Sequence, residues 1–227
     1  MVSTLVAIFH VYGFTQSLGS LILYEKYVSP YRPERFGGPW RFLTYINMNF
    51  QLVVFTLCML TDMAYLFKAK SLGLKLLKIR DFWFSTIGLP FCILVFTTFW
   101  GIFYVDRELV YPAALDEIIP VWMNHVMHSF ILITVLELLF TKHWYPTRWV
   151  GMCVSSATSL AYLAWILHIH AVTGDWVYPI LEELQGGAFL LFIFVLFLLQ
   201  SALYVIGEVL NRATGEYEEK EKSKKKK

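Results

Sequence analysis

The stretch Pro120-Val-Trp-Met-Asn-His-Val-Met-His128 opens an apolar run that continues to Phe140. Roughly 20 apolar residues is the length that a helix needs to cross the ~30 Å hydrocarbon core of a bilayer. Two histidines and an asparagine interrupt this run, and such groups at membrane depth are costly and tend to face an interior or a cavity. We therefore predict a membrane helix over residues 119–141, and we expect it to carry any chemistry that the protein performs.

The composition is that of a membrane protein. Hydrophobic residues make up 57% of the 227 residues, against about 45–50% in an ordinary soluble domain. They gather in continuous runs rather than in alternating patterns, which favours helices over a β-barrel. We predict an all-α, polytopic membrane bundle of six transmembrane helices, with spans at residues 2–24, 41–67, 82–105, 119–141, 149–172 and 186–210.

The domain organisation follows from these spans. Residues 1–211 should form one six-helix domain, and residues 212–227 a basic cytoplasmic tail that we expect to be disordered. Segment 70–80 mixes lysines with leucines, which is typical of an amphipathic helix that lies in the membrane interface. The third span should be kinked or interrupted near Gly88 and Pro90, because proline cannot continue helical hydrogen bonding.

The distribution of basic residues predicts the orientation. Six spans put both termini on one side of the membrane, and the loops and ends on that side hold 14 of the 19 lysines and arginines. Cytoplasmic segments are enriched in these residues, so both termini should be cytoplasmic. The lysine-rich end suggests anionic lipid headgroups or a sorting signal as its target, rather than nucleic acid.

The second span carries a polar stripe. Its members follow steps of three or four residues, which place them on one helical face within an arc of roughly 120°. They are Arg41, Thr44, Asn47, Gln51, Phe55, Cys58 and Asp62. A face this polar should point into the bundle, where it either joins packed helices by hydrogen bonds or lines a functional cavity.

The fourth span offers a base for a hydroxyl on that stripe. Asn124 and His128 are i,i+4 neighbours, so the asparagine amide could orient the imidazole. Both spans should enter the membrane from the same side, which allows Thr44 and His128 to share a level. A histidine beside a hydroxyl can activate it as a nucleophile, whereas a lone membrane histidine commonly serves helix packing.

Two other interpretations stay open on the residues alone. In the first, His125 and His128 supply two metal ligands and His168 or His170 a third, which would make a zinc-dependent membrane lipid hydrolase. In the second, the polar groups only pack, and the protein is a non-enzymatic membrane scaffold or regulator. The chain has no P-loop, no dinucleotide-binding fingerprint, and no zinc-protease or serine-hydrolase motif.

Five stretches resemble one family, that of the androgen-induced gene products and the androgen-dependent TFPI-regulating proteins. In chain order they are Gly37-Gly-Pro-Trp-Arg-Phe-Leu-Thr44, Asp106-Arg-Glu-Leu-Val-Tyr-Pro112, Ile119-Pro-Val-Trp-Met-Asn-His-Val-Met-His128, Thr173-Gly-Asp-Trp-Val-Tyr-Pro179 and Gly207-Glu-Val-Leu-Asn211. Each stretch is short, but five in family order are specific. They extend from the first loop to the end of the last span.

The resemblance implies a membrane threonine hydrolase that cleaves fatty acid esters of hydroxy fatty acids. The family's catalytic threonine matches Thr44, and its catalytic histidine matches His128. On this basis we expect His128 to act as the base, Thr44 to form an acyl-threonine intermediate, and no metal or cofactor to take part. The expected partners are a branched lipid ester and the bilayer.

Four further residues are candidates for supporting roles. Arg41 lies about one turn from the threonine and is a candidate partner for the free carboxylate of the substrate. Asn47 and Asn124 are candidates for donating to the oxyanion or for orienting the catalytic imidazole, and His125 is a candidate for positioning it.

The C-terminal sequence predicts a location. Lys224 and Lys225 stand at the fourth and third positions from the end, which resembles a dilysine retrieval signal on a cytoplasmic tail. We therefore expect a multi-pass protein of the endoplasmic reticulum. A basic tail beside any membrane, including the plasma membrane, is the alternative.

Overall fold

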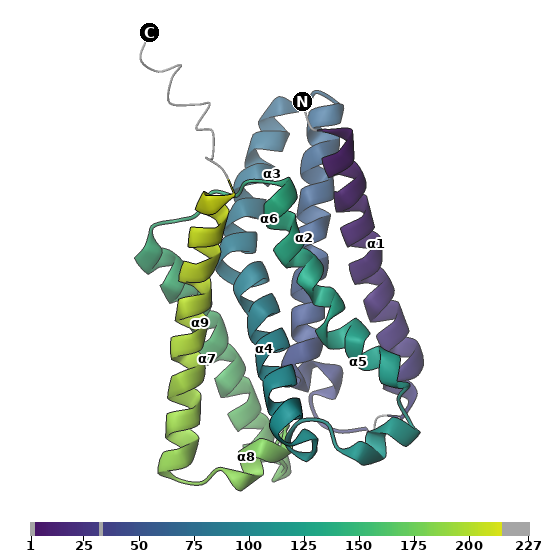
Figure 1. Ribbon diagram of the computed structural model, residues 1–227, viewed down its shortest axis with the longest axis vertical. Helices are drawn as coiled ribbons and strands as arrows, with labels where there is room; N and C mark the ends of the chain where they lie inside the picture. The colour runs from purple at the N-terminus through teal and green to yellow at the C-terminus, as the bar shows by residue number, and fades with distance from the viewer. Residues whose placement is uncertain (1–2, 32–33, 215–227) are drawn as a thin grey trace.

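The computed structural model describes residues 3–31 and 34–214, and the regular elements in these ranges are all helical (Figure 1). Six helical segments are long and apolar enough to cross a membrane, which confirms the predicted all-α, multi-pass architecture. They are Thr4–Tyr31, Leu43–Leu66, Lys70–Val105, Val121–Phe140, Arg148–Thr173 and Gly187–Ala213. The predicted disordered tail lies outside the described residues from position 215 onward.

The helices are named in chain order. They are α1 (Thr4–Tyr27), α2 (Leu43–Leu66), α3 (Lys70–Trp83), α4 (Leu89–Val105), α5 (Val121–His128), α6 (Ile133–Phe140), α7 (Arg148–Thr173), α8 (Pro179–Glu183) and α9 (Gly187–Ala213). A π-helical turn, Phe84–Gly88, joins α3 to α4, and 3-10 turns include Ser29–Tyr31, Gly38–Arg41, Arg107–Leu109, Ala113–Glu117 and Phe130–Leu132.

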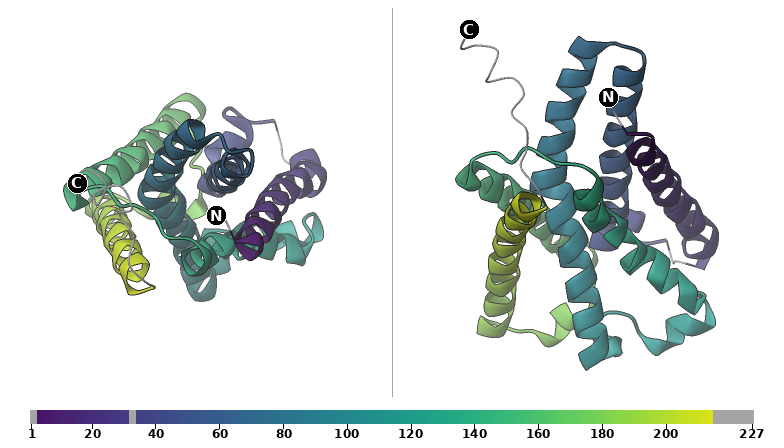
Figure 2. Two further views of the ribbon diagram at one scale, coloured as in Figure 1. Left: turned by 90° about the horizontal axis from the view of Figure 1, so that it is seen from above. Right: turned by 45° about the horizontal axis from the view of Figure 1, so that its top comes forward.

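The bundle is arranged around α2 and the long α3–α4 helix. Helix α1 packs along α2, α2 packs along α3, and α9 packs against both α4 and α7 (Figures 1 and 2). The start of α1 and the end of α9 lie at the same end of the bundle, here called the terminal end (Figure 1). That both termini are cytoplasmic stays a prediction.

The segment predicted to lie in the membrane interface continues directly into the third span, and its place at the interface stays a prediction. Residues Lys70–Val105 form one helical segment of 36 residues. Its charged end is held inside the protein, because Arg80 and Asp81 are 4% and 1% exposed and pair with each other. The sequence pattern could not reveal this internal pairing, while Lys75 and Lys78 of the same segment are exposed.

The predicted interruption of the third span is a π-helical turn rather than a break. The Leu89 amide bonds the Phe84 carbonyl, five residues back. Pro90 follows at once and has no amide hydrogen to give, so the helix must rearrange its bonding ahead of it. The side chains of the turn are buried, and its Gly88 carbonyl accepts from Gln51 of α2 at 3.1 Å.

The fourth span is broken where we expected one continuous helix. Helix α5 ends at His128, a 3-10 turn follows, and α6 resumes at Ile133. Neither proline nor glycine marks this place in the sequence. A carbonyl at the break still finds a partner, since the Cys92 thiol of α4 donates to the Ile131 oxygen at 3.0 Å.

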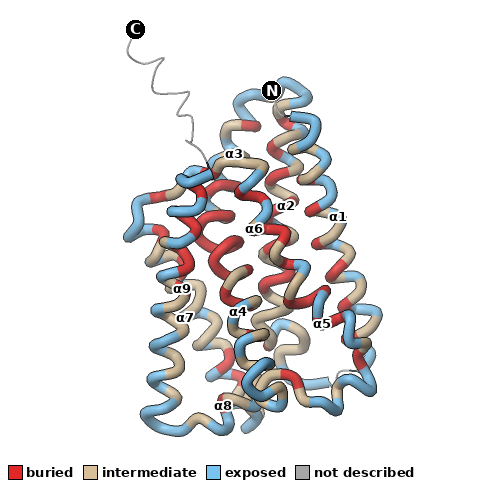
Figure 3. Tube along the Cα trace, in the orientation of Figure 1, coloured by how far each residue is buried: buried red, intermediate tan, exposed pale blue. Residues whose placement is uncertain are grey.

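The polar stripe of the second span points inward, as predicted. Asn47, Gln51, Phe55 and Cys58 are all at most 2% exposed. In contrast, the outer faces of α7 and α9 are apolar and exposed, as suits helices that face lipid (Figure 3). Examples are Leu160, Leu167, Leu190, Leu191, Phe194 and Leu198.

Close packing of α7 on α9 yields a prediction about stability. A Cβ at Gly151 would overlap the ring of Tyr204, which is fully buried and bonds the Pro146 carbonyl. Gly151→Ala should therefore lower the free energy of unfolding by about 1–3 kcal/mol through overpacking. Gly101→Ala on α4 is the matched control, because its Cβ would enter open space. We expect the control to be neutral or more stable by at most ~1 kcal/mol. Unfolding in detergent micelles measures both, and equal stability of the two variants would contradict the packing argument.

Candidate active site

A largely apolar cavity of about 590 Å³ is enclosed by the bundle. The helix ends that supply much of its lining, such as the start of α2 and the end of α5, lie away from the terminal end (Figure 1). Its wall is built from α2, α4, α7 and α9, from the end of α5 and from the loop after α4. Among the polar side chains on this wall are Thr44 and His128. The cavity therefore offers space for lipid chains beside a hydroxyl and an imidazole.

Thr44 and His128 meet in this wall. Thr44 Oγ1 lies 3.1 Å from His128 Nε2, although 84 residues separate them in the chain. Thr44 is in the first turn of α2, and His128 is the last residue of α5. The break after α5 thus places the imidazole at a helix end that faces the cavity.

A backbone contact sets the protonation pattern of His128. Its Nδ1 lies 3.0 Å from the Asn124 carbonyl oxygen. A carbonyl can only accept, so Nδ1 carries the hydrogen and the Nε2 lone pair faces the Thr44 hydroxyl. The Asn124 backbone, not its side-chain amide as we expected, therefore orients the ring.

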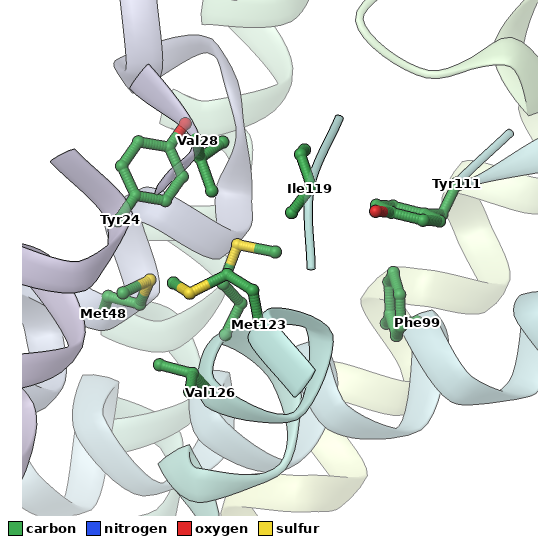
Figure 4. Packing of buried hydrophobic residues seen from close by; sticks show 9 residues of the cluster. Tyr24, Val28, Met48, Phe99, Tyr111, Ile119, Met123 and Val126 are labelled. Carbon is green, nitrogen blue, oxygen red and sulfur yellow. The ribbon is translucent and has the colours of Figure 1, made fainter. Parts of the chain in front are cut away.

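Aromatic packing fixes the plane of the same imidazole. The Phe99 ring stacks on His128 with centroids 3.4 Å apart and planes 4° from parallel. Phe99 belongs to a buried apolar cluster that also holds Met48 of α2 and Met123 of α5 (Figure 4). The cluster ties α5 to α2 and α4, which keeps the threonine and the histidine in register.

Two tyrosines that we had assigned no role stand beside the threonine. The Leu43 amide donates to the hydroxyls of Tyr162 and Tyr178 at 3.1 and 3.0 Å. Tyr162 in turn donates to the Arg41 carbonyl at 3.0 Å. The Tyr178 side chain is within hydrogen-bonding reach of Thr44, and burial raises the pKa of this tyrosine above its ordinary value. Tyr178 therefore stays protonated and is able to donate a hydrogen bond.

The other predicted site residues divide into those that line the cavity and those that do not. Arg41 lines it and is only 3% exposed, but it belongs to a 3-10 turn before α2 rather than to the helix. Asn47 accepts from Gln51 and, like Asn124 and His125, is absent from the cavity wall. His125 lies on the exposed side of α5, where Nδ1 is 3.2 Å from Ser129 Oγ.

The structure does not bring the predicted zinc ligands together. His168 stacks on Trp165 and His170 on Trp176, whereas His128 faces Thr44. Within residues 3–31 and 34–214, the only group of three or more potential ligands close enough to hold a metal ion is His10, Cys58 and Glu137. None of those three was among the residues proposed for zinc.

Comparisons with known proteins agree with the motifs. The family model for the FAR-17a/AIG1-like protein matches residues 5–212. The human androgen-induced gene 1 protein is 38% identical over 204 residues, covering 84% of this chain and 86% of the relative. The androgen-dependent TFPI-regulating proteins of Mesocricetus auratus and Homo sapiens are 36% and 35% identical, each alignment covering 77% of this chain and 76% of the relative.

No solved structure matches the chain. The family match spans almost all of the described bundle, including both residues of the Thr44–His128 pair. The resemblance seen in the five sequence stretches is thereby confirmed. The chain belongs to the FAR-17a/AIG1-like family of multi-pass membrane proteins.

Proposed function

We propose that this protein is an intramembrane lipid ester hydrolase that cleaves fatty acid esters of hydroxy fatty acids. The observation that carries the proposal is the Thr44–His128 hydrogen bond of 3.1 Å in the wall of a largely apolar cavity. A general base must come within ~3 Å of the proton that it removes, and this pair meets that condition. The substrate class follows from the sequence resemblance and is compatible with an apolar binding space.

The first half of the reaction forms an acyl-enzyme. His128 Nε2 takes the proton of Thr44 Oγ1 as the oxygen attacks the ester carbonyl carbon. The tetrahedral intermediate collapses when the bond to the branch oxygen breaks, and the imidazolium returns its proton to that oxygen. The hydroxy fatty acid leaves, and the other acyl chain stays on the threonine.

The second half releases the acyl chain. His128 removes a proton from a water molecule, and the resulting hydroxide attacks the acyl-threonine carbonyl. The proton then returns to Thr44 Oγ1 as the fatty acid departs. In both halves of the reaction, His128 Nδ1–H donates a hydrogen bond to the Asn124 backbone carbonyl. In serine hydrolases an acidic side chain accepts the corresponding hydrogen bond.

The oxyanion needs a donor, and Tyr178 is best placed to provide it. Its hydroxyl lies beside Thr44 and remains protonated. Asn47 and Asn124, which we had considered for this role, do not line the cavity. A donor aimed at the developing negative charge stabilises the transition state more than the ground state.

Arg41 is suited to bind the acidic end of the substrate. It is a buried cation on the cavity wall, three residues before the nucleophile. A fatty acid ester of a hydroxy fatty acid has a free carboxylate, and a guanidinium binds carboxylates with directed, charge-assisted hydrogen bonds. The carboxylate at Arg41 would place the branch-point ester near Thr44.

The pair is tested with Thr44→Ala and His128→Ala in the purified protein. Each should lower kcat for a branched fatty ester by at least ~10³-fold, because nucleophile and base act as a unit. Thr56→Ala and His168→Ala are matched controls, since Thr56 bonds its own helix at Leu52 and His168 is exposed. Both controls should keep wild-type turnover and labelling by a fluorophosphonate probe.

Retention of activity by both Thr44→Ala and His128→Ala would refute the proposed pair. Three results together would instead support the metal-dependent hydrolase: chelation removes wild-type activity, zinc restores that activity, and His168→Ala abolishes it. A chain that turns over no ester under any condition would support the scaffold.

The oxyanion role predicts a specific kinetic effect of Tyr178→Phe. Removing this hydroxyl should lower kcat by about 10²–10³-fold and leave KM nearly unchanged, because the bond is made chiefly in the transition state. Tyr104→Phe is the control, since Tyr104 is 91% exposed. A rise in KM at constant kcat would show that Tyr178 serves substrate binding instead.

The Arg41 role is tested by changing enzyme and substrate together. Arg41→Gln should raise KM for the free-acid substrate by about 10–100-fold, the value of a charged hydrogen bond. The methyl ester of the same substrate has no carboxylate, so the variant and wild type should handle it alike. If the variant loses equal affinity for both compounds, Arg41 has a structural role.

We also assign the protein to the endoplasmic reticulum on the sequence of its C-terminus. Lys224 and Lys225 lie outside the described residues, so the assignment rests on sequence alone. Replacing both with serine in a tagged full chain should move it to later compartments, as seen by fluorescence imaging. An unchanged location would contradict retrieval through these lysines.

A further inference from the structure

A second set of polar, mostly titratable and mostly buried side chains lies at the terminal end of the bundle, and the proposed reaction uses none of them. It joins α1, α2, α3, α6 and the segment after α6. Its members are His10, Cys58, Asp62, Arg80, Asp81, Glu137, Thr141 and His143. None of these residues lines the apolar cavity.

The innermost members have the donor atoms of a metal site. His10, Cys58 and Glu137 offer a nitrogen, a sulfur and an oxygen that lie within 4.8 Å of one another. All three side chains are at most 1% exposed. Nitrogen, sulfur and carboxylate oxygen together are the ligand set that zinc takes in proteins.

Two of the distances among these atoms suit a tetrahedral ion. Zinc bonds of ~2.0–2.3 Å place nitrogen and oxygen ligands roughly 3.3 Å apart, and sulfur and oxygen ligands roughly 3.6 Å apart. The distance between His10 Nε2 and Glu137 Oε1 is 3.1 Å. The distance between Cys58 Sγ and the same oxygen is 3.7 Å.

His143 approaches the group from the side of Glu137. Its Nε2 lies 3.4 Å from Glu137 Oε1 and is buried without a hydrogen-bond partner. The side chain is fully buried and stacks on the Phe84 ring with centroids 3.7 Å apart. This imidazole nitrogen contacts the carboxylate but is not among the atoms that lie within 4.8 Å of one another, so a bound ion would have to draw it inward as the fourth ligand.

Both imidazoles have the outer partner that metal-bound histidines usually have. His10 Nδ1 lies 2.5 Å from Asp62 Oδ2, and His143 Nδ1 lies 3.0 Å from Asp81 Oδ1. Such carboxylates fix the tautomer, so that each Nε2 is left to bind the ion. Asp81 is itself held by Arg80 at 2.7 Å.

Charge is compatible with this assignment. The cluster holds three carboxylates and one guanidinium, and a metal-bound Cys58 adds a thiolate, so neutral imidazoles leave three negative charges, of which one divalent cation offsets two. With a neutral Cys58 thiol, two protonated histidines would offset the two charges that then remain. In that alternative the Cys58 thiol and His143 Nε2 would each pair with Glu137 Oε1, whereas a metal ion would bind these groups directly.

We propose that His10, Cys58, Glu137 and His143 bind a zinc-type divalent cation that has a structural role. Four protein ligands close the coordination sphere, which is typical of structural rather than catalytic zinc. The ion links α1, α2, α6 and the segment between α6 and α7. It takes no chemical part in the ester hydrolysis proposed at the other end of the bundle.

The first test is metal content. The full chain is expressed in zinc-supplemented cells with a tag that has no histidines, purified in detergent without chelator, and analysed by plasma mass spectrometry. The wild type should contain about one zinc per chain, and His10→Asn and Cys58→Ser less than about one-tenth. His168→Asn and Cys153→Ser, at an exposed histidine and an exposed cysteine, should keep the full content.

The second test identifies the ligand atoms by spectroscopy. It starts from the wild-type protein, so it remains informative even if a variant fails to fold. Wild-type protein freed of zinc is titrated with Co²⁺, which should give intense visible absorption of a four-coordinate ion and a thiolate-to-cobalt band in the near ultraviolet. Cys153→Ser should reproduce both features, and Cys58→Ser should lose the thiolate band. A folded wild type without bound metal and without a cobalt spectrum overturns the proposal. So does metal that persists undiminished in His10→Asn and Cys58→Ser.

Discussion

The structure depends on one constraint: polar groups inside a membrane bundle must find their partners within the bundle. Helix α2 meets most of this demand, because its polar face extends through the whole interior. Thr44 contacts α5, Gln51 contacts α6 and the π-helical turn, and Cys58 and Asp62 contact residues of α6 and α1. The surrounding helices are positioned by what this face must bond, while lipid-facing surfaces need only be apolar.

The same constraint explains why the helices are irregular where chemistry is expected. The break between α5 and α6 ends a helix at His128, so the imidazole stands at the cavity instead of within a continuous helical face. The first turn of α2 leaves its Leu43 amide without a helical partner, and two tyrosine hydroxyls satisfy it. Those hydroxyls thereby come to lie beside Thr44. Incomplete backbone hydrogen bonding and the groups proposed to react therefore occur at the same positions.

Sequence reasoning succeeded where a pattern is local and failed where partners are distant. Hydrophobic runs predicted the six spans, and periodicity predicted the buried face of α2. The family resemblance, not periodicity, singled out Thr44 and His128 from similar membrane residues. The continuous α3–α4 helix was missed because Arg80 and Asp81 bond each other and the segment after α6. Tyr178 and the His10–Cys58–Glu137 group were missed because only the fold brings them together.

The two polar sites are mechanically connected through the fourth span. Helix α5 has eight residues, too few to hold its own position, and it continues through one 3-10 turn into α6. Glu137 of α6 is fixed to α1 through His10, with Cys58 of α2 alongside. Any shift of α6 at the terminal end would be passed to His128 over little more than two helical turns. A hydrogen bond tolerates displacements of only a few tenths of an ångström. A rigid attachment at Glu137 is therefore a condition for the Thr44–His128 contact at the far end of the same span.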